Sequence, residues 1–255
     1  MLGTNLLKHS AGSALVKQGE TKVLVANTIQ IGQPSPELPG HGDIVVGVSN
    51  TKGNSIRNAS DGIGLLQAWL QRILDEWLPP KLNLLTGRAC FRLIVTVMIL
   101  KDDGNVRDAA LFACAAAWNC TKLPQMNDFH DVDGKLWLKD PQQSIVSSSD
   151  LDCKTTNNIE DDQKATSNSG TFCRISLTIG VVKTGNDNEA ENIKLLLDPT
   201  LVEQAQVSGL LSCVISLPSF TVQMDYSGSS PLSAADLGLA FKLAKVRAEE
   251  LSRLL

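Results

Sequence analysis

Short apolar segments separated by glycine, proline and polar turns dominate the hydropathy pattern of this chain. The segments 13–18 and 22–31 are predicted to pair as a hairpin, because Gly19-Glu20 between them suits a tight turn. The run 91–100 is almost continuously apolar and rich in β-branched residues, which predicts a central strand covered on both faces. Further strands are predicted at 43–49, 135–138, 172–182, 193–198, 207–217 and 220–225.

Helical spacing of apolar residues predicts one helix after Ser60 or Asp61 and another at the end of the chain. The first ends at Pro79-Pro80, and the last opens with Ser233 and Asp236 in the arrangement of a capping box. Each helix is expected to bury one apolar stripe. The first stripe is Leu66, Trp69, Leu70, Ile73, Leu74 and Trp77, and the last is Leu237, Phe241, Ala244, Ala248, Leu251 and Leu255.

The clearest change in composition lies at 140–170, which is rich in Ser, Asp, Asn, Thr, Gln and Lys. With almost no large apolar side chains, this stretch cannot offset the entropy that ordering would cost. We therefore expect a disordered surface insertion at 140–170 within a single domain that spans 1–255.

The bulk properties narrow the class of protein only slightly. A formal charge of −4 argues against a chain that grips nucleic acid alone through a wide basic face. No apolar run is long enough to span a bilayer, and no secretory signal opens the sequence, so we expect a soluble intracellular protein. The six cysteines contain no C-x-x-C pair and are expected to be reduced, mostly buried thiols.

One junction carries the functional argument. The central strand leads through Asp103-Gly104, a tight turn, into the helix that starts with Asp108-Ala109-Ala110. Small alanines on such a helix let it lie close against a sheet. The sequence 101–110 thus joins a buried strand to a buried helix through one acidic turn.

This junction resembles that of the RNase PH-like family of phosphorolytic exoribonucleases. Two further matches occur in the family's order: 12–25 (GSALVKQGETKVLV) resembles its opening hairpin, and 198–200 (DPT) with Glu203 resembles its DPT-x-x-E segment. The resemblance covers most of 11–255. It implies an α+β fold of the ribosomal protein S5 domain 2-like type, with helices packed against a mixed sheet.

In active members of the family the turn reads DGGTR, and backbone amides, the Thr and the Arg hold the attacking phosphate. At the matching positions this chain keeps Arg107 but has Asn105 for a glycine and Val106 for the hydroxyl donor. Asp108 adds a negative charge that we expect to oppose a nearby phosphate. The resemblance therefore implies weakened anion binding.

The family also uses two carboxylates spaced six residues apart. Counted from Asp198, the second position is Gln204, and an amide neither carries charge nor acts as a general acid. Asp198 is instead expected to cap the turn before Leu201. A register shift of one residue would place the acid at Glu203, and that alternative stays open.

Three arginines are candidate RNA contacts: Arg72, Arg88 and Arg107. Arg72 matches the second of a pair of arginines that guide RNA in related non-catalytic subunits, although an ordinary solvated helix position is the favoured interpretation. Arg88 lies at the entrance of the central strand, where an ion pair is an equal alternative. No spacing of His, Cys, Asp or Glu suits a metal, so no metal site and no cofactor are expected.

Together these features predict a non-catalytic ring subunit of the RNA exosome, resembling the eukaryotic ribosomal-RNA-processing protein 43 type (exosome component 8). Its expected partners are other RNase PH-like ring subunits, cap subunits and single-stranded RNA threaded through the ring for processing, including rRNA maturation. The expected location is the nucleus, nucleolus and cytoplasm. The alternatives are an active phosphate-dependent 3'-5' exoribonuclease and an unrelated α+β interaction domain.

Overall fold

The structure is a computed structural model of the whole chain. The chain divides into two compact units, a main unit of Met1–Lys122 with Thr171–Leu255 and a second unit of Leu123–Gly170. The residues that the structure describes are 1–51, 59–124, 129–132, 135–138, 173–184, 192–217, 219–229 and 231–254.

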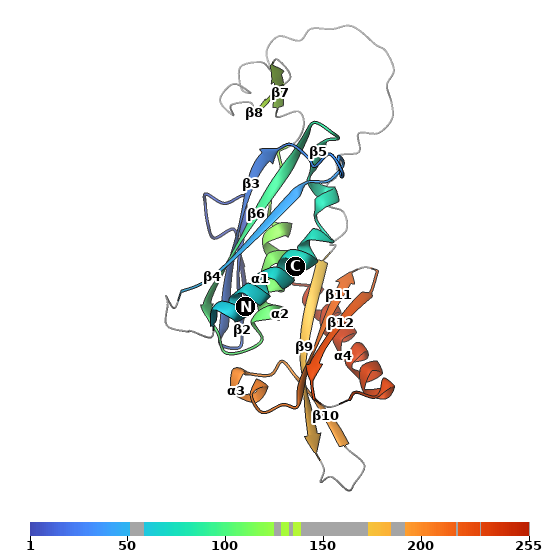
Figure 1. Cartoon of the computed structure of the whole chain (residues 1–255). Helices are drawn as coiled ribbons and strands as arrows, with labels where there is room; N and C mark the ends of the chain where they lie inside the picture. Colours follow the sequence, from blue (N-terminus) through green and yellow to red (C-terminus); the bar gives the residue numbers. More distant parts are fainter. Residues whose placement is uncertain are drawn as a thin grey trace. The chain divides into compact units, whose positions relative to one another are not determined.

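The first sheet of the main unit is mixed (Figure 1). Its order is β1-β2-β3-β6-β4, with the short β5 also paired to β6, and only the β4–β6 pair is parallel. The hairpin and the strands predicted from alternation are confirmed. The bounds are β1 Leu2–Thr4, β2 Gly12–Gln18, β3 Thr21–Gly32, β4 Asp43–Asn50, β5 Asn83–Leu85 and β6 Ala89–Lys101.

The central strand β6 is covered on one face only, so the prediction of two covered faces is wrong. Leu93, Val95 and Val97 are buried, whereas Thr96 and Met98 on the other face are exposed. β-Branched residues favour an extended chain whether or not both faces are packed, which is why the continuous run misled the prediction.

Strand β4 lies at an edge of this sheet, and a side chain covers part of that edge. Gln71 of helix α1 (Ala59–Asp75) accepts from the Val46 backbone N–H at 2.9 Å and donates to the Ile44 carbonyl at 2.8 Å. One side-chain amide thus satisfies two edge groups that a further strand would otherwise pair with.

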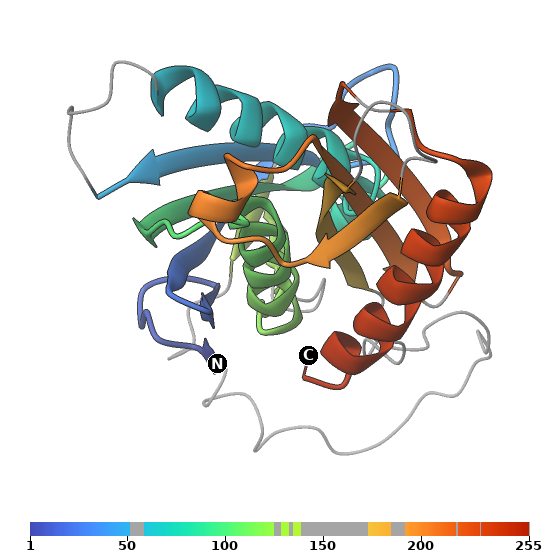
Figure 2. The ribbon, with the colours of Figure 1, turned by 90° about the horizontal axis from the view of Figure 1, so that it is seen from below.

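Two helices contact the first sheet. Helix α1 packs along β4 and buries its predicted stripe from Leu66 to Leu74, with Leu70 and Ile73 fully buried. The last predicted member, Trp77, is also buried but follows the end of the helix at Asp75. Helix α2 (Val106–Asn119) contacts β2 and β3 on one side and β9 of the second sheet on the other. Asp108 to Trp118 are all buried, because alanines allow this close approach on both sides (Figure 2).

The second sheet is antiparallel, in the order β10-β9-β11-β12, and helix α4 packs on β9 and β11. The predicted capping box of Ser233 and Asp236 is present. The line of fully buried residues on α4 is Ala240, Ala244 and Ala248, so the predicted stripe omitted Ala240. Its larger members Leu237, Phe241 and Leu251 are only half-buried, and Leu255 lies outside the described residues. The bounds are β9 Cys173–Thr184, β10 Asn192–Leu197, β11 Gly209–Leu217, β12 Thr221–Gly228 and α4 Ala234–Ser252.

The second unit contains the antiparallel hairpin β7 (Phe129–Val132) and β8 (Lys135–Leu138). The predicted insertion at 140–170 lies outside the described residues. Sequence reasoning missed four short elements of the main unit: β1, β5, the 3-10 helix η1 (Pro79–Leu82) and helix α3 (Leu201–Gln204). Over the described chain, no helix is both long and apolar enough to cross a membrane.

Candidate functional site

The site predicted from sequence forms where the turn 102–107, after β6, meets the segment 198–204 around helix α3. We call this contact the turn junction. The Leu201 backbone N–H donates to the Asp103 carbonyl at 2.8 Å. Gly104 has φ of +100°, and a Cβ there would lie 2.5 Å from Leu201 N and 2.7 Å from the Thr200 carbonyl carbon. Only glycine fits, because both its backbone angle and the close approach exclude a side chain.

Thr21, at the start of β3, holds the turn from beneath. It is 2% exposed, its hydroxyl donates to the Gly104 carbonyl at 2.7 Å, and it accepts from the Asp103 N–H at 3.0 Å. The Gly104 N–H in turn donates to the Asp102 carboxylate at 2.9 Å. The turn therefore meets its hydrogen-bonding needs within the protein.

Asn105 precedes helix α2 in a left-handed conformation, with φ of 54°. Asparagine tolerates this conformation, so it preserves a backbone geometry that glycine would also adopt. Its side chain does not cap α2 but donates to Asp198 Oδ1, and Gln18 at the end of β2 donates to the same oxygen at 2.9 Å. Two amides thus share one oxygen of the Asp198 carboxylate.

The cap of helix α3 is Thr200, so the prediction that Asp198 caps this turn is wrong. Thr200 and Glu203 form a reciprocal capping box, whereas Asp198 has φ of 54° and turns its carboxylate to Gln18 and Asn105. The Thr200 backbone N–H and hydroxyl, both 2.8 Å from Glu203 Oε2, hold the pKa of Glu203 below its usual range.

Neither of the two remaining acid candidates is arranged as a proton donor. Glu203 is ionised and bonded to its own helix end, which disfavours the alternative register. Gln204 donates from Nε2 to the Pro199 carbonyl at 3.0 Å and so braces the same segment.

Asp108 does not face the outer side of the turn, contrary to the expectation that its charge would oppose a bound anion there. It is 3% exposed and accepts from the Thr178 N–H at 2.6 Å and from the Thr178 hydroxyl at 3.1 Å. Burial raises the pKa of Asp108 to about 6, and the hydrogen bonds from Thr178 lessen the rise. This carboxylate ties α2 to β9.

Two of the candidate arginines contact or belong to helix α1: Arg72 lies on it, and Arg107 of α2 packs against its Trp69. The Arg107 guanidinium is 5.7 Å from the centre of the Trp69 ring, and Arg72 pairs with Asp225 of β12 at 3.2 Å. Trp69 and Arg72 are three residues apart on α1 and therefore share a helix face. Arg72 is thus neither a bare solvated position nor an unneutralised charge, because it links α1 to the second sheet.

Arg88 lies elsewhere. It precedes β6, whereas the turn junction follows that strand, and 13 residues at about 3.3 Å each separate the two ends by about 40 Å. The three arginines therefore do not form one cluster. Sequence reasoning missed the partners that define the junction: Gln18, Thr21, Trp69, Thr178 and Asp225. Only Thr21 had a signal, as the Thr of the opening hairpin pattern.

Chemically, the turn junction is closed by its own side chains. The Asn105 and Gln18 amides donate to Asp198 and Glu203 bonds to Thr200, although Asn105 Oδ1 is buried without a hydrogen-bond partner. Within the described residues no group of three or more His, Cys, Asp or Glu side chains suits a metal ion. The exposed guanidinium of Arg107 remains as a cationic group at the start of α2.

Comparison with known proteins agrees with this geometry. Residues 2–124 match the model of the 3' exoribonuclease family, domain 1. This part of the chain is therefore similar to domain 1 of that family. The exosome complex component Rrp42 of Methanosarcina acetivorans is 27% identical over 260 residues, which cover 98% of this chain and 81% of that protein.

Solved structures confirm the RNase PH fold for the whole chain. The Archaeoglobus fulgidus exosome with RNA bound to the active site gives a TM-score of 0.65 at 22% identity, covering 99% of this chain and 86% of the matched one. Rice (Oryza sativa) Rrp46 gives 0.61 at 17% identity, covering 99% and 90%. The predicted α+β class and mixed sheet are confirmed by these matches.

Proposed function

We propose that this chain is a non-catalytic ring subunit of the RNA exosome, with a structural role in the channel that carries single-stranded RNA. The observation that carries the proposal is that Oδ1 of Asp198 accepts from both Gln18 and Asn105, where an active relative needs free acid and phosphate groups. The RNase PH fold and the exosome proteins that share it support the assignment.

Loss of catalysis follows from chemistry at three positions. Val106 has no hydroxyl to donate to phosphate, Gln204 has no proton to give, and Asn105 commits its amide to Asp198. Arg107 alone keeps the required charge, and one guanidinium supplies neither a nucleophile site nor an acid.

The partners of this subunit are, in this proposal, other RNase PH-like ring subunits, cap subunits and RNA held by the assembled ring. The ribosomal-RNA-processing protein 43 type remains the proposed branch, on the strength of the DGN-x-x-DAA pattern at 103–110. Processing of rRNA, and residence in the nucleus, nucleolus and cytoplasm, belong to the same proposal.

A phosphorolysis assay tests the catalytic part. The isolated chain is incubated with oligo-RNA and inorganic phosphate, and nucleoside diphosphate release is measured beside an active phosphorolytic exoribonuclease. We expect no release. Phosphate-dependent release that Arg107→Ala abolishes would establish the active enzyme instead.

Co-purification and native mass spectrometry test the structural part. The chain is expected to enter a six-membered assembly with RNase PH-like partners and to bind RNA at physiological salt only there, since its own net charge is negative. A monomer that ignores every ring subunit would favour an unrelated interaction domain.

A further inference from the structure

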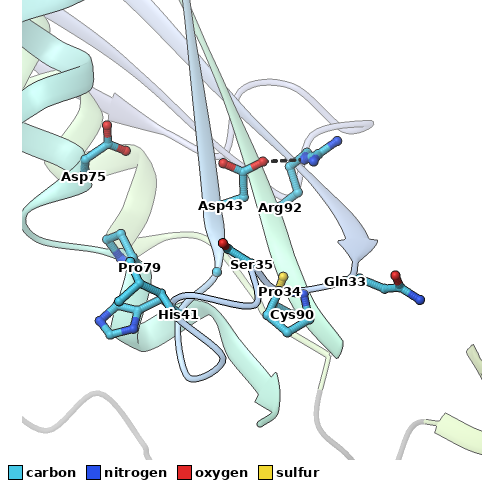
Figure 3. A pocket seen from close by; sticks show the side chains of 11 residues that line it. Gln33, Pro34, Ser35, His41, Asp43, Asp75, Pro79, Cys90 and Arg92 are labelled. Atoms are coloured by element: carbon cyan, nitrogen blue, oxygen red, sulfur yellow. Dashed lines mark hydrogen bonds and ion pairs between the residues drawn. The ribbon is translucent and has the colours of Figure 1, made fainter. Parts of the chain in front are cut away.

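A second hollow lies at the opposite end of β6 from the turn junction. It has a volume of about 620 Å³ and is lined by the loop 33–43, the end of α1, the start of η1 and the first residues of β6 (Figure 3). In this view Asp75 stands on one side, and Asp43 with Arg92 on the other. The turn junction and its residues take no part in it.

The loop 33–43, which forms one wall of this cavity, is held in place by backbone hydrogen bonds and close packing. Gly42 donates from its N–H to the Pro79 carbonyl at 2.8 Å, and a Cβ on Gly42 would lie 2.5 Å from the Phe91 carbonyl oxygen. His41 closes a turn onto Leu38 at 3.1 Å. Close backbone packing and internal turns therefore hold the cavity in shape before any ligand arrives.

The charges that line the cavity favour a cation. Its lining contains two carboxylates, Asp43 and Asp75, against one guanidinium, Arg92, so its formal charge is −1 with His41 neutral. Arg92 is already held by Asp43 at 2.7 Å. Asp75 is exposed and accepts from Gln71 through Oδ1, and a carboxylate accepts more than one hydrogen bond.

The remaining lining suits a flat group on an apolar stem. Pro34, Leu38 and Pro79 contribute apolar surface, His41 lies beside Pro79 with a planar ring, and Cys90, 1% exposed, contributes a buried thiol. A guanidinium is planar, so it stacks on rings and bonds carboxylates through two parallel N–H groups. A lysine ammonium lacks both the flat face and the paired N–H groups. A phosphate group would meet the negative charge of the lining.

We propose that this cavity is a docking pocket for an arginine side chain presented by a protein partner, with Asp75 as its principal acceptor. The pocket lies about one strand length from the turn junction, so a partner docked there leaves Arg107 at the start of α2 uncovered, whereas Arg72 stands one helical turn before Asp75. The inference does not depend on the proposed function.

The test is an NMR titration of the full ¹⁵N-labelled chain with the peptide acetyl-Gly-Arg-Gly-amide. We expect amide shifts at Ser35, His41 and Cys90. The same peptide with citrulline for arginine keeps the shape but removes the charge, and it should bind at least about fivefold more weakly.

Variants locate the acceptor. Asp75→Asn keeps an oxygen for Gln71 but removes the charge, and it should weaken the arginine peptide by about fivefold or more. Asp43→Asn should also weaken it, because Arg92 then loses its neutralising partner. Glu249→Gln, on the exposed face of α4, is the matched control and should leave the titration unchanged.

Three results would overturn the proposal. One is equal binding of the citrulline peptide. A second is a set of shifts that map away from the cavity while the spectrum of Asp75→Asn stays well dispersed. The third is an oligo-uridylate that shifts Ser35, His41 and Cys90 at lower concentration than the peptide, which would make the cavity an RNA site.

Discussion

The two ends of strand β6 differ in what their charged groups do. At the end that follows Lys101, the Asp198 and Glu203 carboxylates are bonded to amides or to a backbone N–H, and the backbones touch at Gly104. At the end that begins with Ala89, Asp75 and the Asp43–Arg92 pair border a cavity of about 620 Å³. The same sheet carries a closed site and an open one.

Under the proposed function, this difference illustrates how a binding site is lost without loss of the fold. Asn105 keeps the left-handed turn that a glycine would provide, and its side chain then fills the site with a hydrogen bond to Asp198. Stability and ligand binding compete for the same polar groups. At the open end, Asp75 is exposed and accepts a hydrogen bond from Gln71 at Oδ1, so its carboxylate can accept further hydrogen bonds from a ligand.

The largest effect is expected at the closed end from Gly104→Ala. The added Cβ clashes with Leu201 N and must adopt φ of +100°, so we expect a loss of about 3 kcal/mol or more in the free energy of unfolding, measured with urea. Gly19→Ala is the control, because Gly19 has φ of +55° with nothing within 4 Å, and should cost about 1 kcal/mol. Equal losses would show that the close contact at Gly104 does not matter.

Asp108 should make the free energy of unfolding depend on pH, by an amount similar to or smaller than the loss expected for Gly104→Ala. Its folded pKa of about 6 lies above the ordinary value of 3.8, so the unfolded chain loses this proton first as pH rises. The contribution of this group to stability is therefore fully present below about pH 4 and is lost by about pH 6, a fall of up to about 3 kcal/mol.

The check is urea unfolding of the wild type and Asp108→Asn between pH 4 and 7. The neutral amide keeps an oxygen for the Thr178 N–H and cannot titrate. The stability difference between the two proteins should therefore shift in favour of the variant as pH rises. A constant difference across this range would contradict the raised pKa.

Asp198→Ala should have a moderate effect. It removes the acceptor that joins Gln18 and Asn105, and it places alanine at φ of 54°, so we expect a loss of about 1–2 kcal/mol. Asp198→Asn keeps an oxygen and tolerates the left-handed backbone, and it should lose less than half as much. Thermal melts of both variants measure the difference, and equal losses would argue against the shared acceptor.

Arg92→Gln should have the smallest effect, because both side chains of its pair with Asp43 are about half exposed. We expect a change below about 1 kcal/mol in the free energy of unfolding. The same unfolding assay serves. A loss in the free energy of unfolding as large as that of Gly104→Ala would show that the Asp43–Arg92 pair contributes as much to stability as the close contact at Gly104.

The elements that depend on local pattern could be predicted from the sequence. The stripe of α1, the capping box of α4 and the hairpin from Gly12 to Gly32 follow from spacing and turn residues alone. The burial of only one face of β6 could not be predicted, because apolar composition is the same for strands covered on one face or two.

The site itself was predicted in position but not in its contacts. The resemblance located Asp198, Gln204 and the turn at Gly104, yet the partners Gln18 and Thr178 are separated from their acceptors by 180 and 70 residues. No local rule specifies pairs at such a distance. The role of Asp108 was missed for the same reason, since only the packed structure shows which side of α2 meets β9.

Gln71 has a consequence for how neighbouring chains can meet this subunit. Its amide bonds to Ile44 and Val46 as one residue of a further strand would, so a strand arriving at β4 must first displace it. Continuation of the sheet into another molecule is therefore disfavoured along this side. A helix residue thus protects this edge of the sheet, so a chain that contacts β4 is expected to use side-chain surfaces rather than backbone pairing there.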